Sequence, residues 1–309
     1  MREYENDRVL IKGNKIKGLN VKKHSNKYYQ KELLIFTLKI LRGFLLIGLT
    51  FVILLPLYKM FVDSINLRAS YEYYFIPNGI TFNNYIRVFE QFINEGVLLN
   101  SWTLSLGCAL IQVMFSSIVG YGFMKLEKSN KFMGKVIFYA YLICLFIPHE
   151  NMRVGYKYLL VEHPLFGIQM FGNKYAIFIM YLFGAGIKSP IFVYLFRTYY
   201  LNFNSEILEQ ARIDGCGPIK EYFKIILPLS LPVIIPTFFL AFAWIYNDGY
   251  FVDFFGLEYN KFNVIARNIY HGRARGGVTS TAFAMMLPVL LMYILVERNL
   301  IKPEVLDYS

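Results

Sequence analysis

The chain has 309 residues, of which 56% are apolar and only 17% are charged, against roughly 45–50% and 25% in ordinary globular domains. That is too little charge for a soluble surface. Because the apolar residues also gather in blocks of about twenty, a soluble enzyme is excluded. The net charge of +11 comes from basic residues that flank these blocks, which favours an anionic membrane surface and no nucleic acid as the partner.

The start of the chain is a basic segment, with eleven Lys or Arg in residues 1–42. The apolar block that follows lacks a small-residue cleavage site, so it is interpreted as a retained anchor and not a signal peptide. We expect residues 1–42 to be a cytoplasmic segment, 43–298 a transmembrane domain, and 299–309 a short cytoplasmic tail.

Six apolar windows predict an all-α integral membrane protein with six transmembrane helices. The windows are 43–62, 101–124, 136–152, 175–196, 229–247 and 278–296. The apolar stretch of the third window ends at Pro148 after twelve residues, a length that also suits a re-entrant segment.

Positive charge predicts the orientation of these helices, because Lys and Arg stay preferentially in the cytoplasm. One set of alternate loops and both termini hold twenty-one Lys or Arg, and the other set holds nine. We therefore expect both termini to be cytoplasmic. Lys188 lies inside the fourth window, where facing lipid is unfavourable, so it faces protein or a wet cavity, or snorkels. It is a candidate for the substrate path, and packing against a partner subunit is the alternative.

Between the fourth and fifth windows, the loop at 202–232 is polar but organised. Asn204 or Ser205 can cap a short helix that runs through Ile213. Gly215 can end it in the left-handed conformation, and Pro218 is placed like the first residue of a second helix. In that helix, spacings of three and four place three apolar residues on one face, namely Phe223, Ile226 and Leu227.

This loop resembles the signature of the permease subunits of bacterial binding-protein-dependent ABC importers, which reads E-A-A, three residues, G and then L-P-x-x-x-P. The matching residues are Glu209, Gln210, Ala211, Ile213, Asp214, Gly215, Phe223, Ile226, Leu227, Pro228 and Pro232. Further matches are similar to the carbohydrate branch, in particular to the smaller membrane subunit of maltose-type importers. They are Phe82, Asn83, Asn84, Tyr85, Phe89, Asn100, Ser101, Arg197, Tyr246, Asn247, Asp248, Ala284 and Pro288.

The resemblance covers about residues 45–295 and has departures. Gln210 replaces the first alanine of the signature, Tyr246 replaces a tryptophan, and the tail at 297–309 lacks the usual glycine-rich end. These departures weaken the inference of a sugar substrate more than the inference of coupling to an ATPase.

In this family the loop implies a coupling helix that seats in a cytoplasmic ATPase subunit. The residues carried over to this role are Glu209, Gln210, Ala211, Asp214 and Gly215. The resemblance also implies a bacterial cell membrane location, a second homologous permease subunit and an extracellular solute-binding protein that delivers a sugar or oligosaccharide. For the substrate path, Tyr246, Asn247 and Asp248 join Lys188 as candidates, with helix capping as the alternative role.

No catalytic or cofactor motif accompanies the signature. The sequence lacks G-x-x-x-x-G-K-[ST], so ATP hydrolysis is expected in a separate subunit, and its four His show no metal-ligand spacing. Cys108, Cys144 and Cys216 lie too far apart for a metal cluster or a disulfide framework, so no cofactor is expected. Three other functions stay open: a permease for a peptide, amino acid or polyamine, a membrane-embedded transferase, and a membrane scaffold.

Overall fold

The computed structural model describes residues 26–67, 75–94, 96–162, 172–173, 175–186, 188–203, 205–256 and 275–301. Over these ranges the chain is helical, and its extended pairing is limited to one antiparallel bridge between Asn66 and Ile80. Of the segment expected at 1–42, the first 25 residues lie outside the described ranges, as do residues 302–309 of the expected tail.

Two compact units divide the chain, Met1–Leu57 and Tyr58–Ser309. The first unit contains most of α1, which runs from Asn26 to Ile65 and includes the first predicted span. Its apolar side chains are well exposed, among them Phe44, Ile47 and Phe51 at 75%, 71% and 63%. Such a long helix with an exposed apolar surface is what the hydrocarbon core of a bilayer accommodates.

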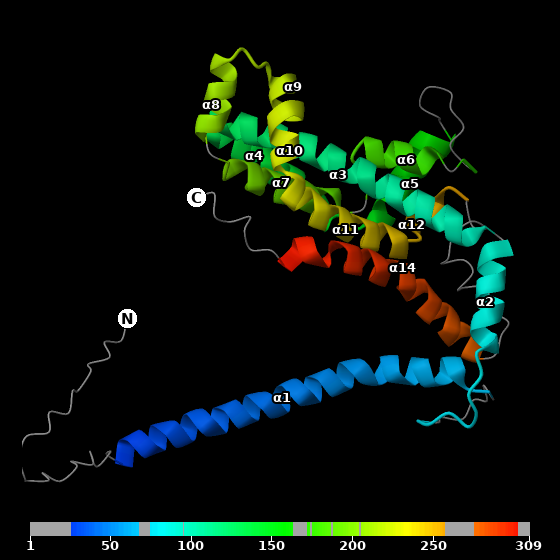
Figure 1. Ribbon diagram of the computed structural model, residues 1–309. Coiled ribbons are helices and arrows are strands. Elements are labelled where there is room, and N and C mark those ends of the chain that lie inside the picture. The colour runs from blue at the N-terminus through cyan, green and yellow to red at the C-terminus, as the bar shows by residue number, and fades with distance from the viewer. Residues whose placement is uncertain are drawn as a thin grey trace, which may run out of the picture. The chain divides into compact units, whose positions relative to one another are not determined.

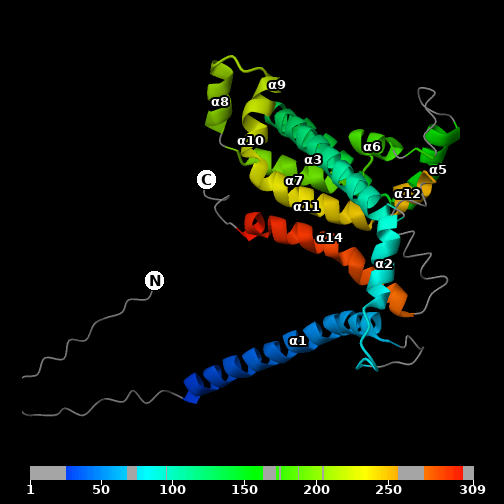
Figure 2. The same cartoon turned by 45° about the vertical axis from the view of Figure 1, so that its right-hand side comes forward.

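Helix α3 (Val97–Ser129) is the central element of the second unit. It packs against α2 (Asn83–Asn94), α4 (Lys131–Ile143), α6 (Tyr175–Leu182), α7 (Ser189–Leu201) and α11 (Leu231–Asn247). Helix α14 (Arg275–Ile301) packs against α2 and α11. Figures 1 and 2 show α3, α7, α11 and α14 running alongside one another, with α8 (Ser205–Ile213) and α9 (Pro218–Glu221) projecting at one end.

The remaining helical segments are short. They are η1 (Cys144–Phe146), α5 (His149–Lys157), η2 (Tyr158–Glu162), η4 (Tyr222–Ile226), α10 (Leu227–Leu229) and α12 (Tyr250–Phe254). Of these, η2 and η4 are π-helical.

Small residues let α3 approach its neighbours closely. A Cβ added at Gly120 would lie 2.8 Å from Phe196 Cβ and 2.9 Å from the backbone nitrogen of Arg197, so α7 passes directly over this glycine. Close contact through small residues is the usual basis of helix association in membranes.

At the corner between α3 and α4, Asn130 Oδ1 accepts a hydrogen bond from the Met133 N–H at 3.1 Å and caps α4.

Membrane spans in the described residues are fewer than the six predicted. Three helices are long and apolar enough to cross a bilayer, Gln30–Ile65, Leu98–Ser129 and Gly277–Glu297, and two bent pairs raise the number to five. One pair bends by 99° where Pro148 interrupts the third predicted span, and the other bends by 77° at Ser230. In the fourth predicted span α6 ends at Leu182 and α7 begins at Ser189, so neither helix alone is long enough to count.

Candidate functional site

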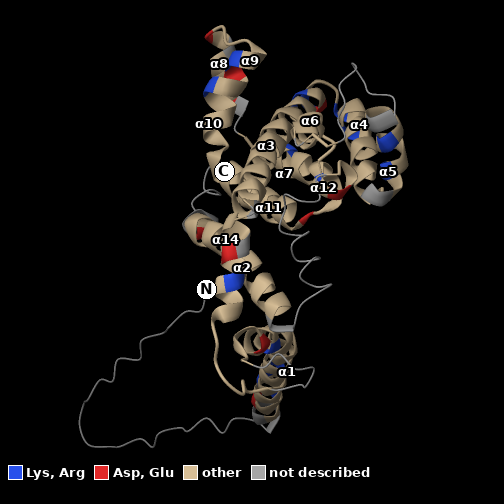
Figure 3. Cartoon of the chain, turned by 90° about the vertical axis from the view of Figure 1, so that its right-hand side faces the viewer, with Lys and Arg blue, Asp and Glu red and all other residues tan. Residues whose placement is uncertain are grey.

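The knob, residues 205–229, begins with α8. Leu208 and Ala211 are buried at 3% and 5% exposure, whereas Glu206 and Glu209 are exposed. Glu206 lies in the first turn, where the positive end of the helix dipole stabilises a carboxylate. One side of α8 therefore packs inward, and its acidic side is open to a partner. Figure 3 shows acidic and basic residues on α8 and α9, whereas α11 carries none.

The corner after α8 has the geometry that the sequence predicts. Gly215 has φ 74°, in the left-handed region that side chains resist. The Cys216 N–H donates to the Ala211 carbonyl at 2.9 Å, the long-range bond of a Schellman-type helix end, and the Asp214 N–H donates to Gln210 O at 3.0 Å. The first arm of the knob is thus closed by backbone hydrogen bonds at a fixed angle.

The second arm begins at Pro218, as predicted, but its register differs from the predicted one. Residues Tyr222–Ile226 form a π-helical turn, which places one extra residue in the turn. Tyr222 and Ile226 are buried, and Phe223 is 53% exposed. The sequence predicts one face for Phe223, Ile226 and Leu227 from spacings of three and four, which assume a regular α-helix, whereas in the π-helical turn Ile226 is buried and Phe223 is exposed.

The outer surface of the knob combines apolar and acidic side chains. Its exposed apolar residues include Ile207 at 42%, Ile213 at 84%, Ile219 at 75% and Phe223 at 53%. Glu209 and Asp214 are also exposed beside them. Bulky apolar residues gathered on a polar projection are typical of a surface that a protein partner covers.

Two ion pairs tie α9 and α7 to α3. Lys125 Nζ lies 2.9 Å from Glu221 Oε2, at the end of α9, and Glu127 pairs with Arg197 on α7. The Arg197 guanidinium carbon is also 4.0 Å from the ring centroid of Phe138 on α4. These contacts bring the loops after α3 and after α7 to the same end of the helix bundle.

The candidate path residues lie at two separate places. Tyr246 is fully buried and stacks on Phe242 with ring centroids 5.6 Å apart. Asn247 Nδ2 donates to the Ala243 carbonyl at 2.8 Å, and Asp248 Oδ1 accepts from the Tyr250 N–H at 3.2 Å. Both polar groups make the local hydrogen bonds expected of helix-end residues.

Lys188 is not part of that group. Its backbone adopts the left-handed conformation, with φ 57°, and its Nζ lies 4.1 Å from the ring centroid of Trp244. Trp244 and Tyr246 are two positions apart on α11 and point to different faces, so Lys188 and Tyr246 do not meet through this helix. Trp244 was missed in the sequence, where nothing but its aromatic type marks it as a partner for a cation.

The amino-acid sequence can now be compared with known protein families. Residues 104–299 match the family described as the inner membrane component of binding-protein-dependent transport systems. The chain belongs to this family. The match extends from α3 to α14 and includes the knob, and it confirms the resemblance inferred from the loop signature. The protein is therefore a multi-pass membrane permease.

Individual relatives cover most of the chain. The arabinooligosaccharides transport system permease protein AraQ of Halalkalibacterium halodurans is 31% identical over 206 residues, which are 63% of this chain and 69% of AraQ. The melibiose/raffinose/stachyose import permease protein MelC of Bacillus subtilis is 24% identical over 254 residues, 80% of this chain and 88% of MelC.

A solved structure shares the fold. It is a crystal structure of a bacterial ABC transporter involved in the import of the acidic polysaccharide alginate, and the match has a TM-score of 0.59 at 18% identity. It covers 85% of this chain and 96% of the matching chain, so the likeness extends over nearly the whole helical arrangement.

Proposed function

We propose that this permease forms part of an ATP-driven importer that carries a sugar or oligosaccharide delivered by an extracellular solute-binding protein. The knob supports this proposal most directly, because a fixed, acidic and apolar projection at one end of the bundle suits docking to a separate ATPase subunit. The arabinooligosaccharide and raffinose-type transport named for the two relatives supports the sugar as the solute class.

For the docking surface we assign the exposed Glu209, Gln210, Asp214 and Gly215 to the contact with the ATPase. Ala211 is buried, so its role is to let α8 pack closely against the rest of the knob. Exposed charge pairs contribute little each, so the apolar residues of the knob supply most of the docking free energy and the carboxylates its orientation.

For the solute path we assign Lys188, with Trp244, at the break between α6 and α7, and Tyr246, Asn247 and Asp248 at the end of α11. The flat face of Trp244 suits stacking on a sugar ring, and Lys188 would move off that face when solute arrives. The capping hydrogen bonds of Asn247 and Asp248 would then keep this end of α11 in place.

In the membrane we propose six spans, with α6 and α7 together forming the fourth, and both termini in the cytoplasm. The charge distribution along the sequence supports this orientation. The complex would contain two ATPase subunits and a second homologous permease, each contacting its own part of the bundle.

Uptake of labelled oligosaccharides by cells tests the proposal. A strain that lacks the chain should lose uptake of at least one sugar in a panel of arabino- and galacto-oligosaccharides, and the wild-type chain should restore it. The variant Gly217→Ala should also restore it, because Gly217 has φ −68° and a Cβ there meets nothing within 4 Å. Unchanged uptake of every sugar together with lost uptake of a peptide, amino acid or polyamine would contradict the sugar assignment.

A further inference from the structure

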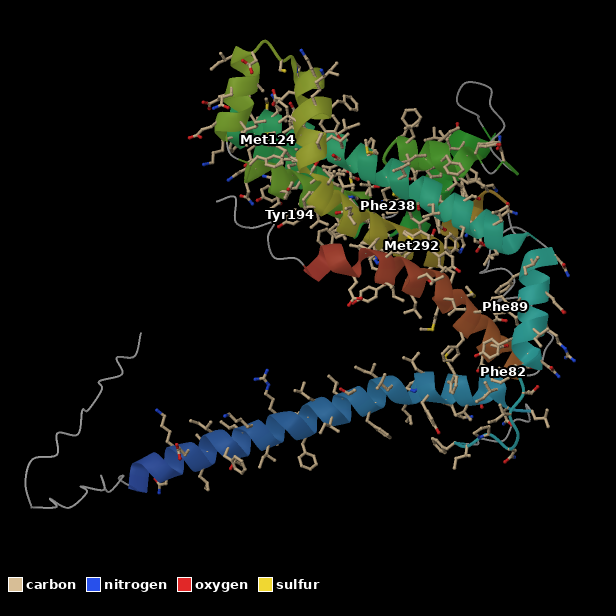
Figure 4. All side chains as sticks on the ribbon, in the orientation of Figure 1. Phe82, Phe89, Met124, Tyr194, Phe238 and Met292 are labelled. Atoms are coloured by element: carbon tan, nitrogen blue, oxygen red, sulfur yellow. The ribbon has the colours of Figure 1, made fainter. Side chains whose placement is uncertain are left out.

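A polar face of α3 meets the second arm of the knob. Ser117, Tyr121 and Lys125 follow each other at intervals of four residues and therefore lie on one side of the helix. Each of them contacts the arm between Pro218 and Tyr222. Met124, labelled in Figure 4, lies near this end of α3 and is fully buried.

Glu221 is the centre of this contact. Its side chain is 1% exposed, its Oε2 accepts from Lys125 Nζ at 2.9 Å, and its Oε1 accepts from the Tyr121 hydroxyl at 3.0 Å. Both carboxylate oxygens are thus bound to α3. A buried carboxylate held from two directions fixes the distance and the angle between two helices more strictly than apolar packing does.

Next to Glu221, a chain of hydroxyls continues the contact to the bend before α11. The Ser117 hydroxyl lies 2.8 Å from the Tyr222 hydroxyl and 2.6 Å from the Tyr200 hydroxyl of α7. The Tyr200 hydroxyl donates to Ser230 Oγ at 3.4 Å, at the 77° bend between α10 and α11. Through these hydrogen bonds, the part of the knob around Glu221 is connected to α3, to α7 and to the start of α11.

Stability alone does not account for an ion pair at this place. Glu221 is buried and Lys125 is 28% exposed; replacement of a buried ion pair by apolar residues of similar size is often neutral or stabilising, whereas loss of the partner of a buried charge is destabilising. Glu221 is also not among the residues that match the loop signature of the family, and its partner Lys125 is 96 residues away in the chain. Directional linkage is the property that an ion pair has and an apolar pair lacks.

We propose that Glu221 is a positioning residue that, through Lys125 and Tyr121, links movement of the knob to α3 and so to the solute path. The proposal rests on the proposed function, because it requires an ATPase subunit that moves the knob. It predicts that removing both charges together leaves the complex assembled but breaks the dependence of ATP hydrolysis on solute.

Two variants separate linkage from folding. Lys125→Met alone removes the Lys125 ammonium from the buried Glu221 carboxylate and should reduce assembly with the ATPase. In the double variant Lys125→Met, Glu221→Gln both charges of this pair are removed, and the amide oxygen can still accept from Tyr121, so assembly should return. The control is Lys128→Met, which removes an exposed charge from the same end of α3.

The measurement is ATPase activity of the complex purified through a tag on this chain, with and without the solute-binding protein loaded with the transported sugar. We expect stimulation by the loaded protein to fall at least about fivefold in the double variant, the lower end of the usual coupling between two sites. Stimulation should be normal in Lys128→Met. Tyr121→Phe, which removes the hydrogen bond from the Tyr121 hydroxyl to Glu221, should give an intermediate loss.

Two outcomes would overturn the proposal. Full stimulation in the double variant would show that the pair transmits nothing, and failure of the double variant to assemble would make the pair an element of folding alone. If wild-type chain retains no ATPase, the proposed function itself fails, and this result is distinct from both.

Discussion

Substitution of Gly215 is the most selective way to perturb the knob. Its φ of 74° lies in the left-handed region, yet a Cβ built there meets nothing within 4 Å. Substitution by alanine therefore adds no steric clash with the rest of the protein and acts through the backbone alone. The strain is about 1–2 kcal/mol, which lowers the population of the closed corner relative to alternatives by a factor of about 5–30.

Gly217 is the matched control for this effect. It lies two residues further along the same corner, a Cβ there also meets nothing within 4 Å, and its φ of −68° is available to any residue. Alanine at Gly217 should be neutral or slightly stabilising, because it reduces the freedom of the unfolded chain.

The assay compares the two alanine variants at equal membrane level. ATPase subunit retained on the tagged chain, and solute uptake, should both fall for Gly215→Ala and stay normal for Gly217→Ala. Gly215→Val should give a larger loss, since a β-branched residue resists positive φ more strongly. Equal retention and uptake in the Gly215→Ala and Gly217→Ala variants would refute the argument that the left-handed corner sets the docking angle.

Three further predictions concern the membrane arrangement, the α3–α4 corner and the solute path. In a chain without native cysteines, a cysteine at Lys128 should be shielded from an impermeant thiol reagent in intact cells and one at Asn94 should react; the reverse pattern would invert the proposed orientation. Gly134→Ala should lower the melting temperature in detergent, because a Cβ there lies 2.5 Å from the Glu127 Cα and overpacking costs about 1–3 kcal/mol. Gly122→Ala, inside α3 with nothing within 4 Å of its Cβ, should melt at or slightly above the wild-type temperature. Asn247→Ala should reduce stimulation of the ATPase by loaded binding protein more than it reduces assembly, and equal losses would leave Asn247 with a capping role only.

Local rules predicted the corner of the knob well. A glycine after a short helix and a proline at the next helix start depend on backbone geometry within a few residues, and both lie where the sequence places them. The π-helical turn at Tyr222–Ile226 was not predictable from periodicity, because the extra residue depends on contacts such as that of Tyr222 with Ser117.

Long-range features of the candidate site were also beyond the sequence. Lys125 and Glu221 are 96 residues apart, and each alone is indistinguishable from an ordinary loop charge. The break before α7 depends on Lys188 adopting φ 57°, which is unusual for a residue with a side chain and could not be inferred from hydropathy. Apolar windows detect membrane segments, but they do not reveal where a span is interrupted.

Photocrosslinking from the tip of the knob tests the central claim most directly. Ile213 is 84% exposed on the knob, and Val154, on α5, is 79% exposed and lies in a segment predicted to face outward. A photoreactive residue at Ile213 should form an adduct with an ATPase subunit in native membranes, and the same group at Val154 should not. Absence of an ATPase adduct from Ile213 in an actively importing strain, or an equal adduct from Val154, would contradict the claim that the knob couples this permease to ATP hydrolysis.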